Sequence, residues 1–180
     1  MTAYVAGSVG AGAGLGGALG AIGLPFAAVL PVGTRGLLFA LAAAIAIGAA
    51  FDGGLVGRAL PSVRRQVDER WMGEYRGWVY GLGFGLQLGA GVVTIVTVSA
   101  VYATFLSAFL SGSATAGALI GGAFGLARSA AVLSVAGVHT SAQLLAVDGR
   151  LARWDRPARR LTILAESALA AAALIAAARV

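Results

Sequence analysis

Four long stretches of the chain carry no charged side chain. They cover residues 5–31, 36–51, 77–127 and 167–178. An α-helix needs about 20 apolar residues to cross the hydrocarbon core of a bilayer. The composition also fits a lipid environment. In this chain 59% of the residues are hydrophobic and 11% are charged, whereas an ordinary soluble domain is about 25% charged. The sequence therefore predicts an all-α, polytopic membrane helix bundle that forms one domain over residues 1–180.

The apolar stretches predict about five transmembrane helices, with six as the alternative count. The predicted spans are 5–31, 35–57, 77–111, 114–138 and 159–180. Pro25 and Pro31 mark a kink or an end in the first span, because proline lacks a backbone donor. Arginine-rich amphipathic segments at 61–76 and 141–158 connect the spans and are expected at the membrane surface.

The stretch 77–111 is too long for one upright span. A single helix over it would measure roughly 50 Å, against a hydrocarbon core of about 30 Å. β-branched residues and hydroxyls follow the glycines at 91–99, so we expect the helix to break there. A strongly tilted helix and two full spans are the alternatives. Because the first half has a similar break at Pro25, residues 5–57 and 77–138 form a weak repeat, a pattern found in transporters.

The basic residues gather in two short segments. All thirteen are arginine, and the formal net charge is +6. The two clusters comprise Arg58, Arg64, Arg65, Arg70 and Arg76, and then Arg150, Arg153, Arg156, Arg159 and Arg160. Short basic loops orient membrane helices toward the cytoplasm, so we expect both clusters and the N-terminus on the cytoplasmic side of the plasma membrane. Nucleic acid is not an expected partner, because no basic domain lies outside these segments.

Glycine recurs at every fourth residue in three of the apolar stretches. The positions are Gly12, Gly16 and Gly20; Gly77, Gly81, Gly85 and Gly89; and Gly117, Gly121 and Gly125. In lipid, small residues at this spacing let helix backbones approach closely. The glycine runs therefore predict helix packing within the chain, with another copy of the chain, or with a partner membrane protein.

Catalytic and metal chemistry find little support in the sequence. The chain has no cysteine, which excludes disulfides, thiol relays and thiolate-ligated metals. The stretch D148-G-R-L-A-R153 resembles the core motif of the CDP-alcohol phosphotransferases, which bind two metals with four aspartates. Leu145, Thr162, Glu166 and Ala170 stand at the flanking positions where that family has further aspartates and a glycine. Too few carboxylates remain for a dinuclear site, so we expect no enzyme activity, no metal and no cofactor.

A family resemblance covers about a third of the chain. The stretch GWVYGLGFGLQLGAGVVTIVTVSAVYATFLSAFLSGSATAGALIGGAFGLARS, residues 77–129, resembles the second repeat of the CcdA/DsbD-like transmembrane family, which is akin to the TauE and LysE-type exporters. The resemblance implies a glycine-rich helix that breaks within the membrane and is followed by a Gly/Ala-rich helix. Redox members carry a Pro-Cys pair at each break, whereas this chain has Pro25-Phe26 and Thr94-Ile95. Only the scaffold or an export function carries over.

A few polar residues lie deep in the predicted spans. Arg128 is the charge farthest from either end of its span, and intramembrane ionisable groups are costly and typical of functional sites. We expect it either to pair with Glu166 or to receive an anionic substrate. Gln87, Thr94, Thr97 and Ser99 are expected to line the same cavity. His139, at a helix end, is expected at the interface.

These observations lead to two functional hypotheses. The first is a small transporter or exporter that moves a small solute or ion along a path beside the break in 77–111. The second is a non-catalytic membrane subunit whose glycine faces pack against a partner membrane protein or another copy of itself. A polar cavity at Thr94 and Arg128 favours transport, and a dry, unbroken bundle favours the subunit.

Overall fold

The computed structural model describes residues 1–29, 33–55, 76–91, 99–133, 137–138 and 140–180. Within these residues the regular structure is entirely helical. The helices are α1 (Thr2–Val29), α2 (Gly33–Asp52), α4 (Gly77–Ala90), α5 (Ala100–Leu110), α6 (Ala114–Leu133) and α7 (Ser141–Arg179). The prediction of an all-α fold is confirmed.

Large apolar side chains of the described residues point outward, and the buried positions are mostly small. Leu119, Leu164 and Trp154 are 73%, 65% and 60% exposed, while Ala108 and Ala177 are fully buried. Such a surface suits a hydrocarbon solvent and not water. Within the described residues, three helices are long and apolar enough to cross a membrane, over Thr2–Ala27, Gly33–Asp52 and Leu145–Arg179. The membrane character predicted from the sequence is therefore supported.

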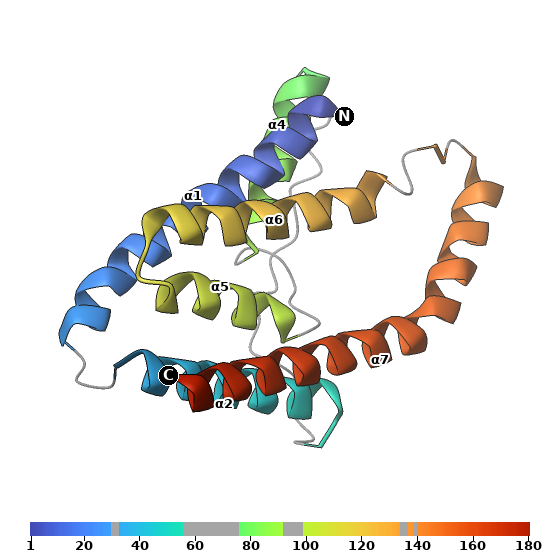
Figure 1. Cartoon of the computed structure of the whole chain (residues 1–180). Helices are drawn as coiled ribbons and strands as arrows, with labels where there is room; N and C mark the ends of the chain where they lie inside the picture. The colour runs from blue at the N-terminus through green and yellow to red at the C-terminus, as the bar shows by residue number, and fades with distance from the viewer. Residues whose placement is uncertain (30–32, 56–75, 92–98, 134–136, 139) are drawn as a thin grey trace.

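The closest helix packing involves α1, with α6 on one side of it and α4 on another (Figure 1). A methyl group added at Gly16 would overlap the backbone of Gly117, and one added at Gly85 would overlap the carbonyl of Tyr4. The hydroxyl of Ser8, which is fully buried, donates to the carbonyl of Gly125 at 2.7 Å. Glycine thus brings these backbones into direct contact, as the four-residue spacing predicts.

Helix α5 lies between this group and an antiparallel pair formed by α2 and the C-terminal part of α7 (Figure 1). Ala170 and Ala173 are buried on α7, and Ala42 and Ile45 are buried on α2. Alanine at these positions allows two helices to pack closely without large side chains between them.

The stretch 77–111 does not form one helix. Helix α4 ends at Gly91, which has φ 65° and whose N–H donates to the carbonyl of Leu88. A left-handed residue ends an α-helix, and glycine adopts it without a Cβ penalty. Helix α5 then begins at Ala100, so the expected break is present and the tilted single helix is excluded. Residues 92–98 themselves lie outside the described residues.

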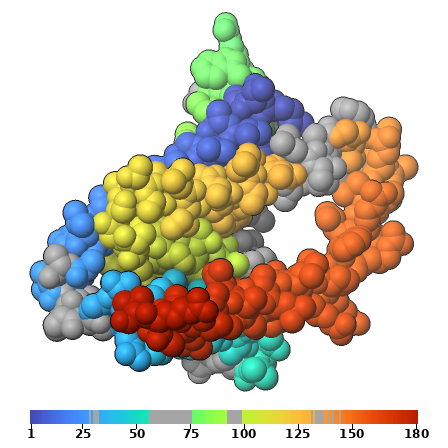
Figure 2. Space-filling model, viewed as in Figure 1, coloured from blue at the N-terminus to red at the C-terminus, as the bar shows by residue number. Residues whose placement is uncertain are grey.

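Helix α7 differs from the prediction of a surface segment at 141–158 followed by a span at 159–180. It is one helix of 39 residues that begins with a capping box between Thr140 and Gln143 and contains Pro157. Proline kinks a helix by removing one backbone bond, and Figure 1 shows α7 changing direction along its length. Figure 2 shows its N-terminal part standing away from the bundle, with an opening between it and α6.

The other predictions about helix ends and surface segments concern Pro25, Pro31 and residues 61–76, and only some of these residues are described. Pro25 lies inside α1, which continues to Val29, so the helix does not end there. Pro31 lies outside the described residues. So does the amphipathic segment predicted at 61–76, apart from Arg76.

Candidate functional site

Ser99, Asp52 and Glu166, here named the carboxylate cluster, join α5, α2 and α7. Their side chains are buried, with 3%, 2% and 5% of their surface exposed. The backbone N–H of Ser99 donates to both carboxylate oxygens of Asp52, at 2.9 and 3.1 Å. The Ser99 hydroxyl donates to Oε1 of Glu166 at 2.5 Å. One serine at the break therefore connects two acidic side chains from distant parts of the sequence.

Helix ends and a glycine position the cluster. Asp52 is the last residue of α2, and a turn with Gly54 at φ 78° follows it. Its carboxylate meets the N-terminus of α5, where the first N–H groups lack partners in their own helix and the helix dipole favours a negative charge. A Cβ on Gly48 would lie 2.6 Å from the Ser99 hydroxyl oxygen, so glycine at this position leaves the room that Ser99 occupies.

Arg159 fastens α7 to the end of α2. Its Nε donates to the backbone carbonyl of Asp52 at 2.6 Å. A cation at the C-terminal end of a helix is favourable, because the last carbonyls lack intrahelical partners. Arg159 lies seven residues before Glu166, about 10 Å away along the same helix. Helix α7 thus contacts this region twice. Arg159 donates to the backbone carbonyl of Asp52, and Glu166, two turns later, accepts from Ser99.

A cavity of about 540 Å³, here named the hydroxyl cavity, lies beside Glu166. Its walls come from α2, α5, α6 and α7, and they consist of Ile45, Ala100, Ala103, Thr104, Ser107, Ile120, Thr162, Ala165, Glu166 and Leu169. Glu166 is the one ionisable side chain in this lining of described residues. Its Oε2 is buried and has no hydrogen-bond partner within the described part of the chain.

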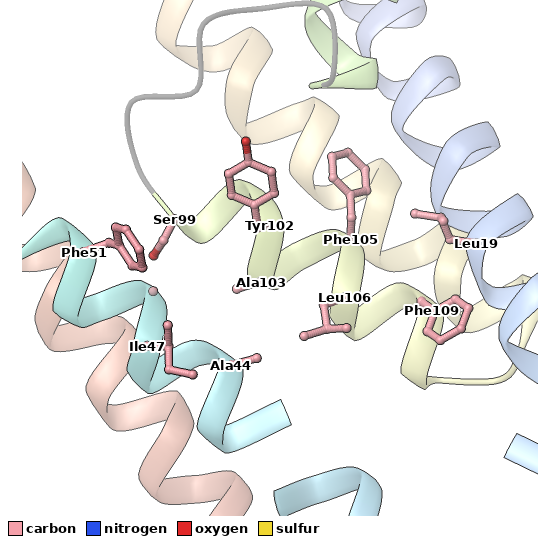
Figure 3. Close-up of a pocket in the computed structure, with 11 residues that line it drawn as sticks. Leu19, Ala44, Ile47, Phe51, Ser99, Tyr102, Ala103, Phe105, Leu106 and Phe109 are labelled. Atoms are coloured by element: carbon pink, nitrogen blue, oxygen red, sulfur yellow. The ribbon is translucent and has the colours of Figure 1, made fainter. Parts of the chain in front are cut away.

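A second cavity of about 520 Å³, here named the apolar cavity, lies between α2 and α5 (Figure 3). Aromatic side chains dominate it: Phe51, Tyr102, Phe105 and Phe109, with Leu19 at the α1 side. In Figure 3 the Ser99 side chain lies near Phe51 at one end of the view. Ala103 lines both cavities, so a short stretch of α5 separates them.

Arg128 does not join this site, which corrects the expected pair with Glu166. The Arg128 guanidinium lies over the ring of Phe124, 5.4 Å from its centroid, and in the vicinity of Tyr4. Tyr4 belongs to α1 and stacks on Phe84 of α4 at 5.7 Å. The structure therefore places Arg128 in an aromatic environment between α1, α4 and α6, while Glu166 contacts Ser99 and lies within electrostatic range of Asp52.

The other predicted site residues have different outcomes. Ser99 and Glu166 come together as expected for one site. Gln87 is half-buried on α4, which packs on α1 and α6 and not on the carboxylate cluster. Thr94, Thr97 and His139 lie outside the described residues.

The predicted packing glycines also divide. Close approaches are present at Gly12, Gly16, Gly20, Gly85, Gly89, Gly117, Gly121 and Gly125. Gly81 makes only ordinary contacts with Tyr4, and a Cβ on Gly77 would meet nothing within 4 Å. Most of these close approaches are to another helix, and that of Gly20 is to Ser113, between α5 and α6.

Several residues of the site were not predicted. Asp52 directly follows the uncharged stretch 36–51, and an acidic residue at such a boundary was a usable signal. Thr104, Ser107 and Thr162 look like ordinary helix residues, because their hydroxyls bond the preceding turn. Gly48 does not belong to the runs with glycine at every fourth residue, so nothing in the sequence predicts its proximity to Ser99.

Asp148, the acid of the D-G-x-x-A-R stretch, is exposed on α7. Within the described residues no three His, Cys, Asp or Glu side chains lie together in a way that could hold a metal ion.

Comparison of the chain with protein-family models, curated proteins and solved structures finds no match.

Proposed function

We propose that the protein is a small integral membrane transporter that moves a small solute or ion past the carboxylate cluster. The observation that carries the proposal is Glu166, a buried acidic side chain whose Oε2 has no partner and which lines the hydroxyl cavity. An ionised carboxylate within a bilayer is costly and typically marks a substrate or ion pathway.

The break between α4 and α5 supports this proposal. Transporters place their sites at discontinuous helices, where helix ends supply partial charges inside the membrane. Irregular backbone at membrane depth is tolerated where it is buried in protein or lines a cavity. Here the N-terminus of α5 meets Asp52, and both cavities touch the first turns of α5. The CcdA/DsbD-like resemblance also implies a break after a glycine-rich helix.

Helix lengths support a topology of five crossings. Helices α4 and α5 have 14 and 11 residues, about 21 and 17 Å, so neither alone crosses a core of about 30 Å. We propose that the two cross the membrane together as one broken span, and that α1, α2, α6 and the C-terminal part of α7 supply the others. The N-terminus and both arginine-rich segments then lie in the cytoplasm, in a plasma-membrane protein.

The alternative of a packing subunit has less support from the geometry. In that hypothesis the glycine faces pack against a partner protein or another copy of the chain. The glycines with close approaches, however, already contact other segments of this chain. The large side chains that remain outside, such as Leu119 and Leu164, suit contact with lipid chains.

Access to the cavities from the two sides of the membrane tests the transport proposal. Because the chain has no cysteine, a single cysteine can be labelled without background. We expect Ala103→Cys, at the boundary of both cavities, to react with an impermeant methanethiosulfonate in both right-side-out and inside-out vesicles. Val101→Cys is the matched control on α5, because Val101 is 8% exposed and lines neither cavity.

Transport requires two-sided access at Ala103 and none at Val101. Labelling of Ala103→Cys from one side only, or equal labelling of both variants, would contradict a path through this site.

A further inference from the structure

The polar groups of the hydroxyl cavity present hydrogen-bond acceptors only. Three hydroxyls donate their hydrogens to their own helices: Thr104 to the carbonyl of Ala100 at 2.8 Å, Ser107 to Ala103 at 2.7 Å, and Thr162 to Ala158 at 3.1 Å. A hydroxyl that donates in this way keeps its oxygen lone pairs for a second partner. The cavity therefore accepts hydrogen bonds from a ligand and donates none through these groups.

The one ionisable side chain in the described lining of the cavity is acidic. This side chain is Glu166, and its Oε1 is already held by the Ser99 hydroxyl. Its Oε2 faces no hydrogen-bond partner in the described part of the chain. The nearest arginine along α7, Arg159, donates instead to the carbonyl of Asp52. A ligand that carries N–H donors and a positive charge satisfies both Oε2 and the hydroxyl oxygens.

The size and the walls of the cavity point to more than a bare ion. A volume of about 540 Å³ falls in the range of about 300–1,000 Å³ that is usual for organic ligands. Most of the lining is hydrocarbon, including Ile45, Ile120 and Leu169. An inorganic cation would leave these walls unused, whereas a short alkyl chain would bury its surface against them.

We propose that the hydroxyl cavity binds a protonated primary amine with a short apolar chain. The ammonium group donates to the Glu166 carboxylate and to a hydroxyl oxygen of the lining, and the alkyl chain lies against the aliphatic wall. A primary ammonium has three N–H donors, enough for one carboxylate and one or two further acceptors. The inference that amines are the transported substrates rests on the proposed function. Binding of an amine in the cavity is tested separately.

Binding of hexylammonium chloride to the purified protein in detergent tests the inference by calorimetry. We expect 1-hexanol and sodium chloride to bind at least about tenfold more weakly, because one lacks the charge and the other lacks the chain. Glu166→Gln should weaken hexylammonium binding about tenfold or more, since it replaces a charge-assisted bond by a neutral one. Asp148→Asn is the matched control, an equal change of charge on the exposed face of α7.

A second variant keeps the test valid if Glu166→Gln does not fold. Thr104→Val preserves the carboxylate and the shape of the side chain but removes one acceptor, and we expect it to weaken binding about threefold to tenfold. Equal binding of 1-hexanol, unchanged binding in these variants, or binding of sodium with the same dependence on Glu166 would overturn the amine site.

The two proposals fail in different ways. Two-sided labelling of Ala103→Cys without amine binding would remove the amine and leave transport. Amine binding that depends on Glu166, together with one-sided labelling, would remove transport and leave the binding site.

Discussion

At the scale of single residues, Ser99 has more consequences than its size suggests. It begins α5 beside the break, its N–H holds Asp52 and its hydroxyl holds Glu166. Both acids would otherwise be buried with unsatisfied oxygens, which costs more than a typical hydrogen bond contributes. The serine therefore makes a pair of buried carboxylates tolerable.

Ser99→Ala should destabilise the protein by about 1–3 kcal/mol, because it removes the hydroxyl bond to Oε1 of Glu166 and so leaves this oxygen, like Oε2, buried without a hydrogen-bond partner in the described part of the chain. The free energy of unfolding in mixed detergent measures the effect. Ser167→Ala is the control, because the Ser167 hydroxyl bonds the preceding turn of α7 on an exposed surface. Equal stability of the two variants would contradict the role given to Ser99.

Arg128 and Glu166 should behave as independent residues. Because their contacts lie with Phe124 and Ser99, respectively, we expect the effects of Arg128→Met and Glu166→Leu on stability to add within about 0.5 kcal/mol. A double-mutant cycle measures this sum. Recovery of stability in the double variant would instead show a direct ion pair between them.

At the scale of elements, close packing of α1 with α6 depends on which face of the helix a glycine occupies. Gly16 faces the backbone of Gly117, whereas a Cβ on Gly14 would meet nothing within 4 Å. Both glycines lie in the same helix and two residues apart, so they share the same intrinsic helix propensity.

Gly16→Ala should therefore lower the stability of the protein, and Gly14→Ala should leave it unchanged or raise it by up to about 1 kcal/mol. The added methyl at position 16 forces α1 and α6 apart, while at position 14 it only reduces the freedom of the unfolded chain. Thermal unfolding in detergent compares the two variants. A similar loss in both would show that packing against α6 does not depend on Gly16.

The sequence predicted the helical class, the close-packing glycines of α1 and α6, and the break after Gly91. Those features follow from local rules: charge-free length, small residues at a four-residue spacing, and a helix that is too long for the bilayer. Gly77 is an exception to these rules, because a Cβ on it meets no neighbour within 4 Å. A spacing identifies a face of a helix but not how far its neighbour extends.

The site was less accessible from the sequence than the fold. Asp52 and Ser99 are 47 residues apart and Ser99 and Glu166 are 67 apart, so only tertiary packing brings them together. Arg128 drew attention because it was the charge deepest in its predicted span. In the structure, however, its guanidinium lies over the ring of Phe124. A search for acidic partners in the sequence does not find such a cation–π contact.

At the scale of the whole molecule, the bundle has two parts with different characters. Helices α1, α4 and α6 pack through glycine, while α2, α5 and α7 form the carboxylate cluster and, together with Ile120 of α6, line the hydroxyl cavity. The N-terminal part of α7, with exposed Arg150, Arg153 and Arg156, stands away from both parts (Figure 2).

The proposed orientation makes a prediction for the whole chain in its membrane. Ser62→Cys and Ala152→Cys, one in each arginine-rich segment, should not react with an impermeant thiol reagent in intact cells and should react after permeabilisation. The reason is that short arginine-rich segments stay on the cytoplasmic side. Labelling of either position in intact cells would exclude the five-crossing topology.

The position of Glu166 near the end of α7 also sets an order for biosynthesis. The ribosome completes α1, α4, α5 and α6 before it synthesises Glu166, so the glycine contacts can form while Asp52 and Ser99 still lack their third member. A nascent chain that stops before α7 would leave the Ser99 hydroxyl and one side of α2 facing lipid. Helix α7, which is synthesised after the other described helices, therefore closes the polar site, and a cell that degrades chains with exposed intramembrane carboxylates would remove the unfinished protein.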